Sequence, residues 1–238
     1  MRTKAIVIKK TPMNEYDQMV TCYSEDFGGM RAIARGSLRP ASVQSLHVDA
    51  LNLIEFEVIQ GRTYPIVSSA ESIAEYPTLK SSLPRLAAVQ FFTEVLDRIM
   101  FENEKDDDLW DFLIGMLEHF DGIPNNAVLA SFRRKQKEFL QVLGYAPRVD
   151  RCVVCSEDAL SGPEKMVAVS PELGGVLCAD CFLAGGRGLL FEKSHVQNLI
   201  RPAAELAAAR GGALDTFFEY IVGSQLNSLV FLYQSAKI

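Results

Sequence analysis

The sequence is poor in histidine, the residue that enzymes use most often for proton transfer. It contains three histidines, which lie in His47-Val-Asp, His119-Phe-Asp and His195-Val-Gln. No GxSxG, Walker A or HExxH motif occurs, so the signatures of a serine hydrolase, a nucleoside triphosphatase and a zinc protease are missing. We therefore predict that the chain is not an enzyme and has no catalytic residues.

Long apolar runs are also missing. A membrane-spanning helix needs about 18 consecutive apolar residues, and no window of the sequence reaches that length. The N-terminal segment has only four in succession, Ala5–Ile8, which is too few for a secretory signal. These absences predict a soluble cytoplasmic protein that has no membrane partner.

The chain lacks the excess of positive charge that is typical of a nucleic-acid-binding protein, because its net charge is −6. The charge is unevenly distributed. Residues 1–40 carry seven Lys/Arg against four Asp/Glu, and residues 127–151 carry six against two. Residues 71–126 carry four against twelve. Overall charge therefore gives no support to nucleic-acid binding, but two segments are locally basic.

The first 75 or so residues have the composition of β-strands. Five runs rich in Val, Ile, Thr, Tyr and Phe alternate with turn signals such as Phe27-Gly-Gly29 and Gln60-Gly-Arg62. The predicted strands are Ala5–Lys9, Met19–Tyr23, Met30–Ala34, Leu46–Ile59 and Tyr64–Ser68. This pattern favours a small barrel, and both an oligonucleotide-binding (OB) type and an SH3-like type fit it.

After Thr78 the apolar residues recur at helical spacing. The sequence predicts helices from Thr78 to Ile99, Asp107–Phe120, Ala127–Leu143, Lys193–Ala209 and Leu214–Tyr233. The fold class is therefore α+β and multi-domain, with the strands preceding the helices. The expected domains are a barrel at 1–76, a helical domain at 77–147 and 188–238, and a metal-binding insertion at 148–187.

Four of the five cysteines form two CxxC pairs. Cys152 and Cys155 are followed, after 22 residues, by Cys178 and Cys181. This spacing allows four thiolates to surround one tetrahedral ion, which predicts a structural Zn²⁺ in a ribbon or knuckle. Redox CxxC pairs and a rubredoxin-like iron site are the alternatives. A catalytic deaminase zinc is disfavoured because no HxE motif is present. The fifth cysteine, Cys22, is expected to be a small buried hydrophobe.

Basic side chains gather in the barrel sequence. Arg31 and Arg35 share one face of the predicted strand and its extension, with Arg39 four residues further on. Lys4, Lys9 and Lys10 belong to the first strand. Small barrels bind single-stranded nucleic acid with such patches and with aromatic stacking surfaces. The candidate stacking residues are Tyr16, Tyr23 and Phe27, and simple solvation of the charges is the alternative.

A second basic group lies on the helix predicted at Ala127–Leu143. Arg133, Arg134 and Lys137 occupy a face other than the apolar one. They are candidates for contacting phosphates, although a solvated helix face explains them equally well.

Four stretches of the chain together resemble the bacterial RecO family. Two are the N-terminal segment from Ala5 to Gly36, including Asn14-Glu-Tyr-Asp, and the helix end Phe139–Pro147 that leads into Asp150–Cys155. The others are the return segment Val169–Cys178 and the last helix, Phe218–Phe231. They follow one another in the family's order over nearly the whole chain.

The resemblance implies an N-terminal OB barrel, a helical domain and an inserted four-cysteine zinc element. It also implies a nucleoid-associated mediator of DNA repair and recombination that binds single- and double-stranded DNA and anneals strands. The implied partners are RecR, single-stranded-DNA-binding protein and, indirectly, the recombinase RecA.

One departure bears on DNA affinity. Family members often carry more Lys/Arg after the Ala-Arg-Gly turn, whereas Ser37–Ser42 keeps only Arg39. An alternative function is therefore a protein-interaction scaffold with little intrinsic DNA binding.

Overall fold

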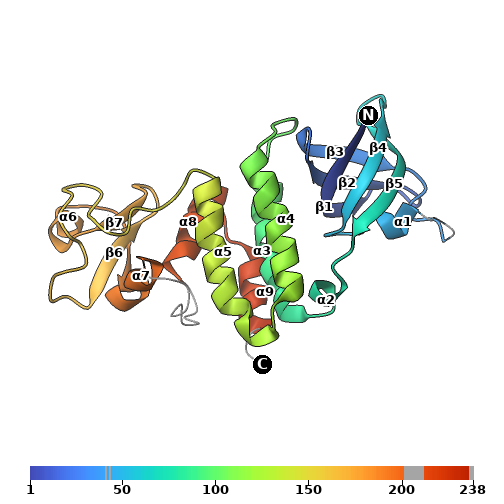
Figure 1. Ribbon diagram of the computed structural model, residues 1–238. Helices are drawn as coiled ribbons and strands as arrows, with labels where there is room; N and C mark the ends of the chain where they lie inside the picture. The colour runs from blue at the N-terminus through green and yellow to red at the C-terminus, as the bar shows by residue number, and fades with distance from the viewer. Residues whose placement is uncertain (41, 43, 201–211, 236–238) are drawn as a thin grey trace. The chain divides into compact units, whose positions relative to one another are not determined.

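A computed structural model describes residues 1–40, 42, 44–200 and 212–235 (Figure 1). The chain divides into two compact units, Met1–Ile123 and Pro124–Ile238. Among the described residues, no helix combines the length and the apolar character needed to cross a membrane.

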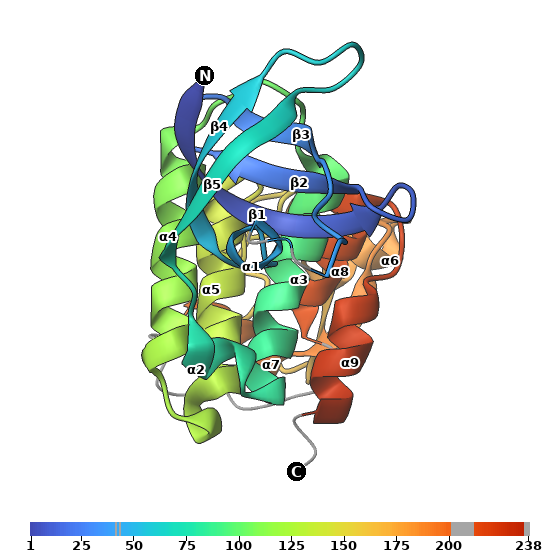
Figure 2. The same cartoon turned by 90° about the vertical axis from the view of Figure 1, so that its right-hand side faces the viewer.

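The first unit begins with a closed five-stranded barrel (Figures 1 and 2). Its strands are β1 (Arg2–Pro12), β2 (Gln18–Ser24), β3 (Gly28–Ala34), β4 (Leu53–Ile59) and β5 (Ile66–Ala74). The order around the barrel is β1-β2-β3-β5-β4, and a single parallel pairing of Ile33 with Ile66 joins β3 to β5. This confirms the predicted OB-like barrel.

Alternation of side chains creates the interior of the barrel. In β4, Ile54, Phe56 and Val58 are buried, whereas Glu55 and Glu57 lie between them on the other face. Cys22 on β2 is also buried, as expected, and burial raises the pKa of its thiol to about 12. The thiol therefore behaves as part of the apolar core.

The strand predicted at Leu46–Ile59 is wrong in its first half. Residues Gln44–His47 form the short helix α1, and β4 begins only at Leu53. Leu51 has a positive φ of 66°, and the Asn52 side-chain amide donates to the His47 carbonyl at 3.0 Å. This local turn interrupts the extended conformation that the β-rich composition predicts. The last strand of the barrel, β5, is longer than the predicted strand Tyr64–Ser68 and extends to Ala74.

Three helices complete the first unit: α2 (Pro77–Lys80), α3 (Leu83–Ile99) and α4 (Asp107–Gly122). The Phe92 ring lies edge-on to Phe91 and Phe112, with centroid distances of 5.1 and 5.8 Å. The Asp106 carboxylate caps α4 by accepting the Leu109 N–H at 3.0 Å. The helices are therefore held by an aromatic core and by a side-chain cap.

The α3–α4 loop contacts the barrel directly. The Asn103 N–H donates to the Gly29 carbonyl at 2.9 Å, and the Asp106 N–H donates to the Tyr23 hydroxyl at 3.0 Å. Gly28 has a φ of 68°, and a Cβ there would overlap the Glu104 carbonyl. Only glycine tolerates both the positive φ and the close approach of the Glu104 carbonyl. The Phe27-Gly-Gly29 turn therefore connects β2 to β3 and also contacts the α3–α4 loop.

The second unit contains helices and a small sheet. The helical elements are η1 (Asn125–Ala127), α5 (Val128–Val142), α6 (Ala179–Leu183), α7 (Lys193–Ile200), α8 (Ala213–Val222) and α9 (Asn227–Ser235). The strands β6 (Met166–Ser170), β7 (Gly175–Leu177) and β8 (Leu189–Glu192) pair in the order β7-β6-β8.

Two helix predictions for this unit need correction or restriction. The helix predicted at Leu214–Tyr233 is interrupted, because Gly223 ends α8 in the left-handed region with a φ of 73°. The chain resumes a helical path at Asn227. The helix predicted at Lys193–Ala209 begins as expected, but its part beyond Ile200 lies outside the described residues.

A buried ion pair joins α5 to α8. The Arg133 guanidinium donates to the two Asp215 oxygens at 2.5 and 3.2 Å, and Gln136 donates to Asp215 at 2.8 Å. Tyr233 on α9 bonds to both charged groups. Burial lowers the pKa of Arg133, but the negative charge of Asp215, together with Tyr233, raises it by more. The pKa of Arg133 therefore lies above its ordinary value. The expectation that Arg133 lies on an outer basic face is therefore wrong.

We predict that Asp215→Ala lowers the free energy of unfolding of the second unit by about 3–5 kcal/mol, because it leaves the Arg133 charge buried without its partner. Urea unfolding of the full chain measures the change. The matched control is Glu138→Gln, which breaks the Lys135–Glu138 pair on α5, whose carboxylate side chain is 44% exposed, and should cost about 1 kcal/mol or less. Equal losses for the two variants would contradict a structural role for the buried pair.

Candidate metal centre and nucleic-acid surface

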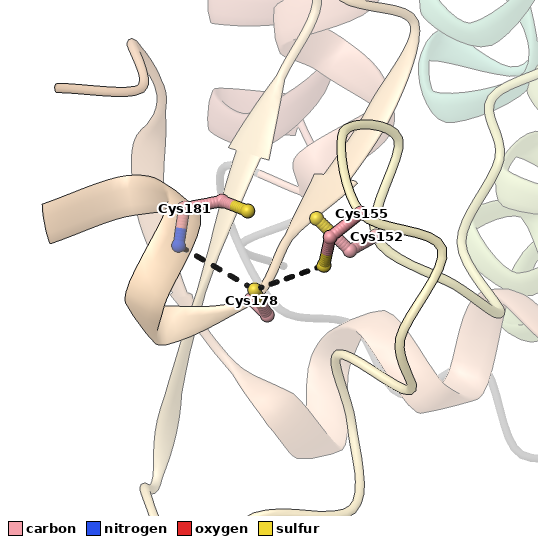
Figure 3. A group of neighbouring side chains, drawn as sticks. All are labelled: Cys152, Cys155, Cys178 and Cys181. Carbon is pink, nitrogen blue, oxygen red and sulfur yellow. Dashed lines mark hydrogen bonds between the residues drawn. The ribbon is translucent and has the colours of Figure 1, made fainter. Parts of the chain in front are cut away.

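The four predicted cysteine ligands come together in the second unit (Figure 3). Cys152 and Cys155 lie on the loop between α5 and β6. Cys178 directly follows β7, and Cys181 lies in α6. All four sulfur atoms lie within 4.8 Å of one another.

Backbone hydrogen bonds shape the loop of the first pair. The Cys152 N–H donates to the Glu157 carbonyl at 2.8 Å, and the Ser156 N–H returns to the Cys152 carbonyl at 3.0 Å. Ser156 has a positive φ of 65°, which closes the turn around the sulfurs. The Val153 N–H donates to the Val176 carbonyl at 2.9 Å and ties this loop to β7, just before Cys178.

The second pair sits where β7 passes into α6. The Cys178 sulfur lies 3.5 Å from the Cys181 amide nitrogen and accepts its N–H as a helix cap. The Gly186 N–H then donates to the Cys181 carbonyl at 3.1 Å. The short helix therefore places Cys181 beside the first pair.

The donor set fits a tetrahedral thiophilic cation. Sulfurs at about 2.3 Å from a shared ion are roughly 3.8 Å apart, and the Cys155 and Cys178 sulfurs are 3.5 Å apart. Although burial opposes ionisation of Cys152, backbone N–H groups of Cys155, Cys178 and Val154 lower the pKa of its thiol to about 6. The neighbouring sulfurs, by contrast, raise the pKa of Cys155 and Cys181, so a bound cation is needed to hold all four as thiolates. The thiolate is the form that binds a metal. Four thiolates leave no open coordination position, so such an ion would stabilise the fold rather than catalyse a reaction.

We predict that Cys178→Ser abolishes stoichiometric metal binding, and that complete chelation of the wild type lowers its melting temperature by on the order of 10 °C. The reason is that the binding energy of a structural metal is also folding energy. Elemental analysis and thermal unfolding measure the two effects. Cys22→Ala is the control, because this core cysteine belongs to the barrel and is not one of the four clustered ligands, so its loss should leave the metal content unchanged. A melting temperature unaffected by complete chelation would contradict a structural metal.

The basic residues predicted on the barrel are divided into two groups by their neighbours. Four of them lie within 4 Å of a carboxylate in the same unit. The pairs are Lys4–Glu25 (3.4 Å), Lys9–Asp97 (2.8 Å), Lys10–Asp49 (2.6 Å) and Arg31–Glu102 (3.7 Å). Sequence reasoning missed these acidic partners, because most of them are distant along the chain and no local pattern signals them.

Arg35 and Arg39 form the other group. Both are exposed, and neither makes an ion pair within 4 Å in the part of the chain that the structure describes. The Arg39 guanidinium lies over the Tyr16 ring, 5.1 Å from its centroid. Of the other expected stacking residues, Tyr23 is buried and cannot serve, and Phe27 is half-buried.

The second basic group lies in the other unit. Arg133 is buried, Arg134 is exposed and Lys137 is half-buried on α5. The group therefore does not form one continuous accessible strip. Only Arg134 and Lys137 have exposure compatible with contact to a phosphate.

Comparison with known proteins agrees with this architecture. Residues 1–76 match the family model described as "Recombination protein O N terminal", and residues 80–201 match "Recombination protein O C terminal". The chain belongs to the RecO family. The two matches together span most of the sequence, including the barrel and all four cysteines.

Several relatives named "DNA repair protein RecO" cover much of the chain. The protein from Desulforamulus reducens is 27% identical over 241 residues, which are 96% of this chain and 92% of the relative. The protein from Symbiobacterium thermophilum is 25% identical over 240 residues, covering 95% and 94%. The one from Cutibacterium acnes is 30% identical over 188 residues, covering 76% and 73%.

Membership of the RecO family supports a role as a mediator of DNA repair and recombination. It does not favour the alternative of a scaffold with little DNA binding. Experiments on that role can be directed at two parts of the structure, the barrel and the cysteine cluster.

Proposed function

We propose that this RecO-family chain binds DNA, anneals complementary strands and, together with RecR, helps to load RecA onto DNA coated by single-stranded-DNA-binding protein. The observation that carries the proposal is a closed OB-like barrel in a chain that matches both RecO family models, with two exposed arginines that make no ion pair within 4 Å among the described residues. The proposed location is the cytoplasm, in association with the nucleoid.

The proposed cofactor is one Zn²⁺ held by Cys152, Cys155, Cys178 and Cys181. Support comes from the mutual distances of the sulfurs and from a donor set of four thiolates. The ion would supply stability alone, and the mediator role requires no catalytic residue. We propose three functional parts: a DNA-binding barrel at 1–76, a helical body at 77–147 and 188–238, and the zinc element at 148–187.

Within the proposed DNA-binding surface, Arg35 and Arg39 are the primary phosphate contacts. Lys4, Lys9 and Arg31 contribute less, as does Lys10, because a phosphate must first displace a carboxylate from each of them. Exposed ion pairs of this kind are worth about 0–1 kcal/mol, so a phosphate displaces the carboxylate at a cost of that size. Arg134 and Lys137 on α5 are secondary candidates.

We predict that Arg35→Ala/Arg39→Ala weakens binding to single-stranded DNA and makes the log–log salt dependence shallower by about 1.4, since each neutralised phosphate contributes about 0.7. Fluorescence anisotropy titrations at several salt concentrations measure both quantities. Lys4→Ala/Lys9→Ala removes the same charge from the same barrel and should have a smaller effect. Unchanged affinity in the arginine double variant would remove these two residues from the site.

The mediator role itself is tested by annealing. Complementary oligonucleotides coated with single-stranded-DNA-binding protein should anneal faster when the chain is added, and RecA should assemble faster when RecR is also present. If the chain binds bare DNA yet accelerates neither process, the mediator role fails while DNA binding stands.

A further inference from the structure

Two turns at one edge of the barrel are linked by hydrogen bonds. In the β1–β2 turn, the Asn14 side-chain oxygen accepts the N–H groups of Tyr16 and Asp17 at 2.9 and 2.8 Å. The turn that follows β3 binds to it, because the Leu38 N–H donates to the Tyr16 carbonyl at 2.9 Å. The Gly36 N–H donates to the Asp17 carboxylate at 2.7 Å. The backbone that carries Tyr16 is therefore held in place from both sides.

This linkage displays an aromatic ring and a guanidinium together. The Tyr16 side chain is 49% exposed, and Arg39 lies over its ring at 5.1 Å. Both residues of the pair lie at the surface. A tyrosine ring and an arginine plane are the two surfaces on which unpaired bases stack in single-strand-binding proteins.

The nearby Asp17 carboxylate is hydrogen-bonded within the turn. The Asp17 carboxylate accepts from the Asn14 amide at 3.0 Å as well as from Gly36. These bonds, with the charges of Arg35 and Arg39, lower the pKa of Asp17. Asp17 thus offsets part of the positive charge of Arg35 and Arg39, but among the described residues it makes no ion pair within 4 Å with either of them.

We infer that Tyr16 and Arg39 form a stacking site for an unpaired base, and that this site makes the barrel selective for single-stranded over double-stranded DNA. The inference rests on the proposed DNA-binding function. With most barrel cations already paired to carboxylates, the phosphate attraction that both forms of DNA share is weak. Base stacking then supplies a larger share of the affinity, and only unpaired bases offer a free face to the ring.

The test compares Tyr16→Ala, Tyr16→Phe and wild type in binding to a single-stranded oligothymidine, an abasic strand of equal length and a duplex. Tyr16→Ala should weaken binding to oligothymidine on the order of tenfold, with no change in salt slope. Tyr16→Phe should bind within about twofold of wild type, because the ring is retained. Binding to the abasic strand and to the duplex should be the same in all three proteins.

The matched control is Tyr220→Ala, which removes a tyrosine of similar exposure (54%) from the second unit and should leave every affinity unchanged. Equal loss of affinity for oligothymidine and for the abasic strand in Tyr16→Ala would overturn the inference, because stacking cannot explain it. So would unchanged binding to oligothymidine, although DNA binding as such would then stand. A wild type that binds none of the three ligands would refute the proposed DNA binding and, with it, the stacking site.

Discussion

An excess of carboxylates over cations is the constraint on which the arrangement of this protein depends. With a net charge of −6, most of the basic side chains singled out by the sequence find an acidic neighbour. In the barrel these pairs are exposed and individually weak. On α5 the same tendency produces a buried pair, in which Arg133 meets Asp215 among three helices. Binding of a polyanion therefore depends on the few cations left over, and their position defines the functional surface.

The cysteine cluster and the barrel were predictable because short-range patterns determine them. A CxxC spacing permits both sulfurs of a pair to face one ion, so the ligand set can be identified without knowing the fold. Alternation in β4, with Ile54, Phe56 and Val58 on one face, likewise identifies a strand. The closure of five such strands into an OB-like barrel was then one of two barrel types that the sequence favoured.

The wrong predictions share a different cause. Residues before Leu53 have a β-rich composition, but a left-handed Leu51 and the Asn52 side chain form a turn instead. Gly223 stops α8 inside a segment whose apolar periodicity runs on. Arg133 is charged but buried, because its partner Asp215 lies 82 positions later in the chain. Periodicity cannot report such a partner, and neither can it report the carboxylates beside Lys9 and Arg31.

The close approach at Gly28 bears on where the chain could be cut. The match to the N-terminal family model ends at residue 76, yet the hairpin at Gly28 and Gly29 abuts the loop that follows α3. A fragment truncated after that match would lose the carbonyl and amide groups that cover this hairpin. It would also expose Tyr23, whose hydroxyl bonds to Asp106. A piece that ends at Ile123, the boundary of the first unit, retains these contacts, so the barrel and helices α2, α3 and α4 form one physical part.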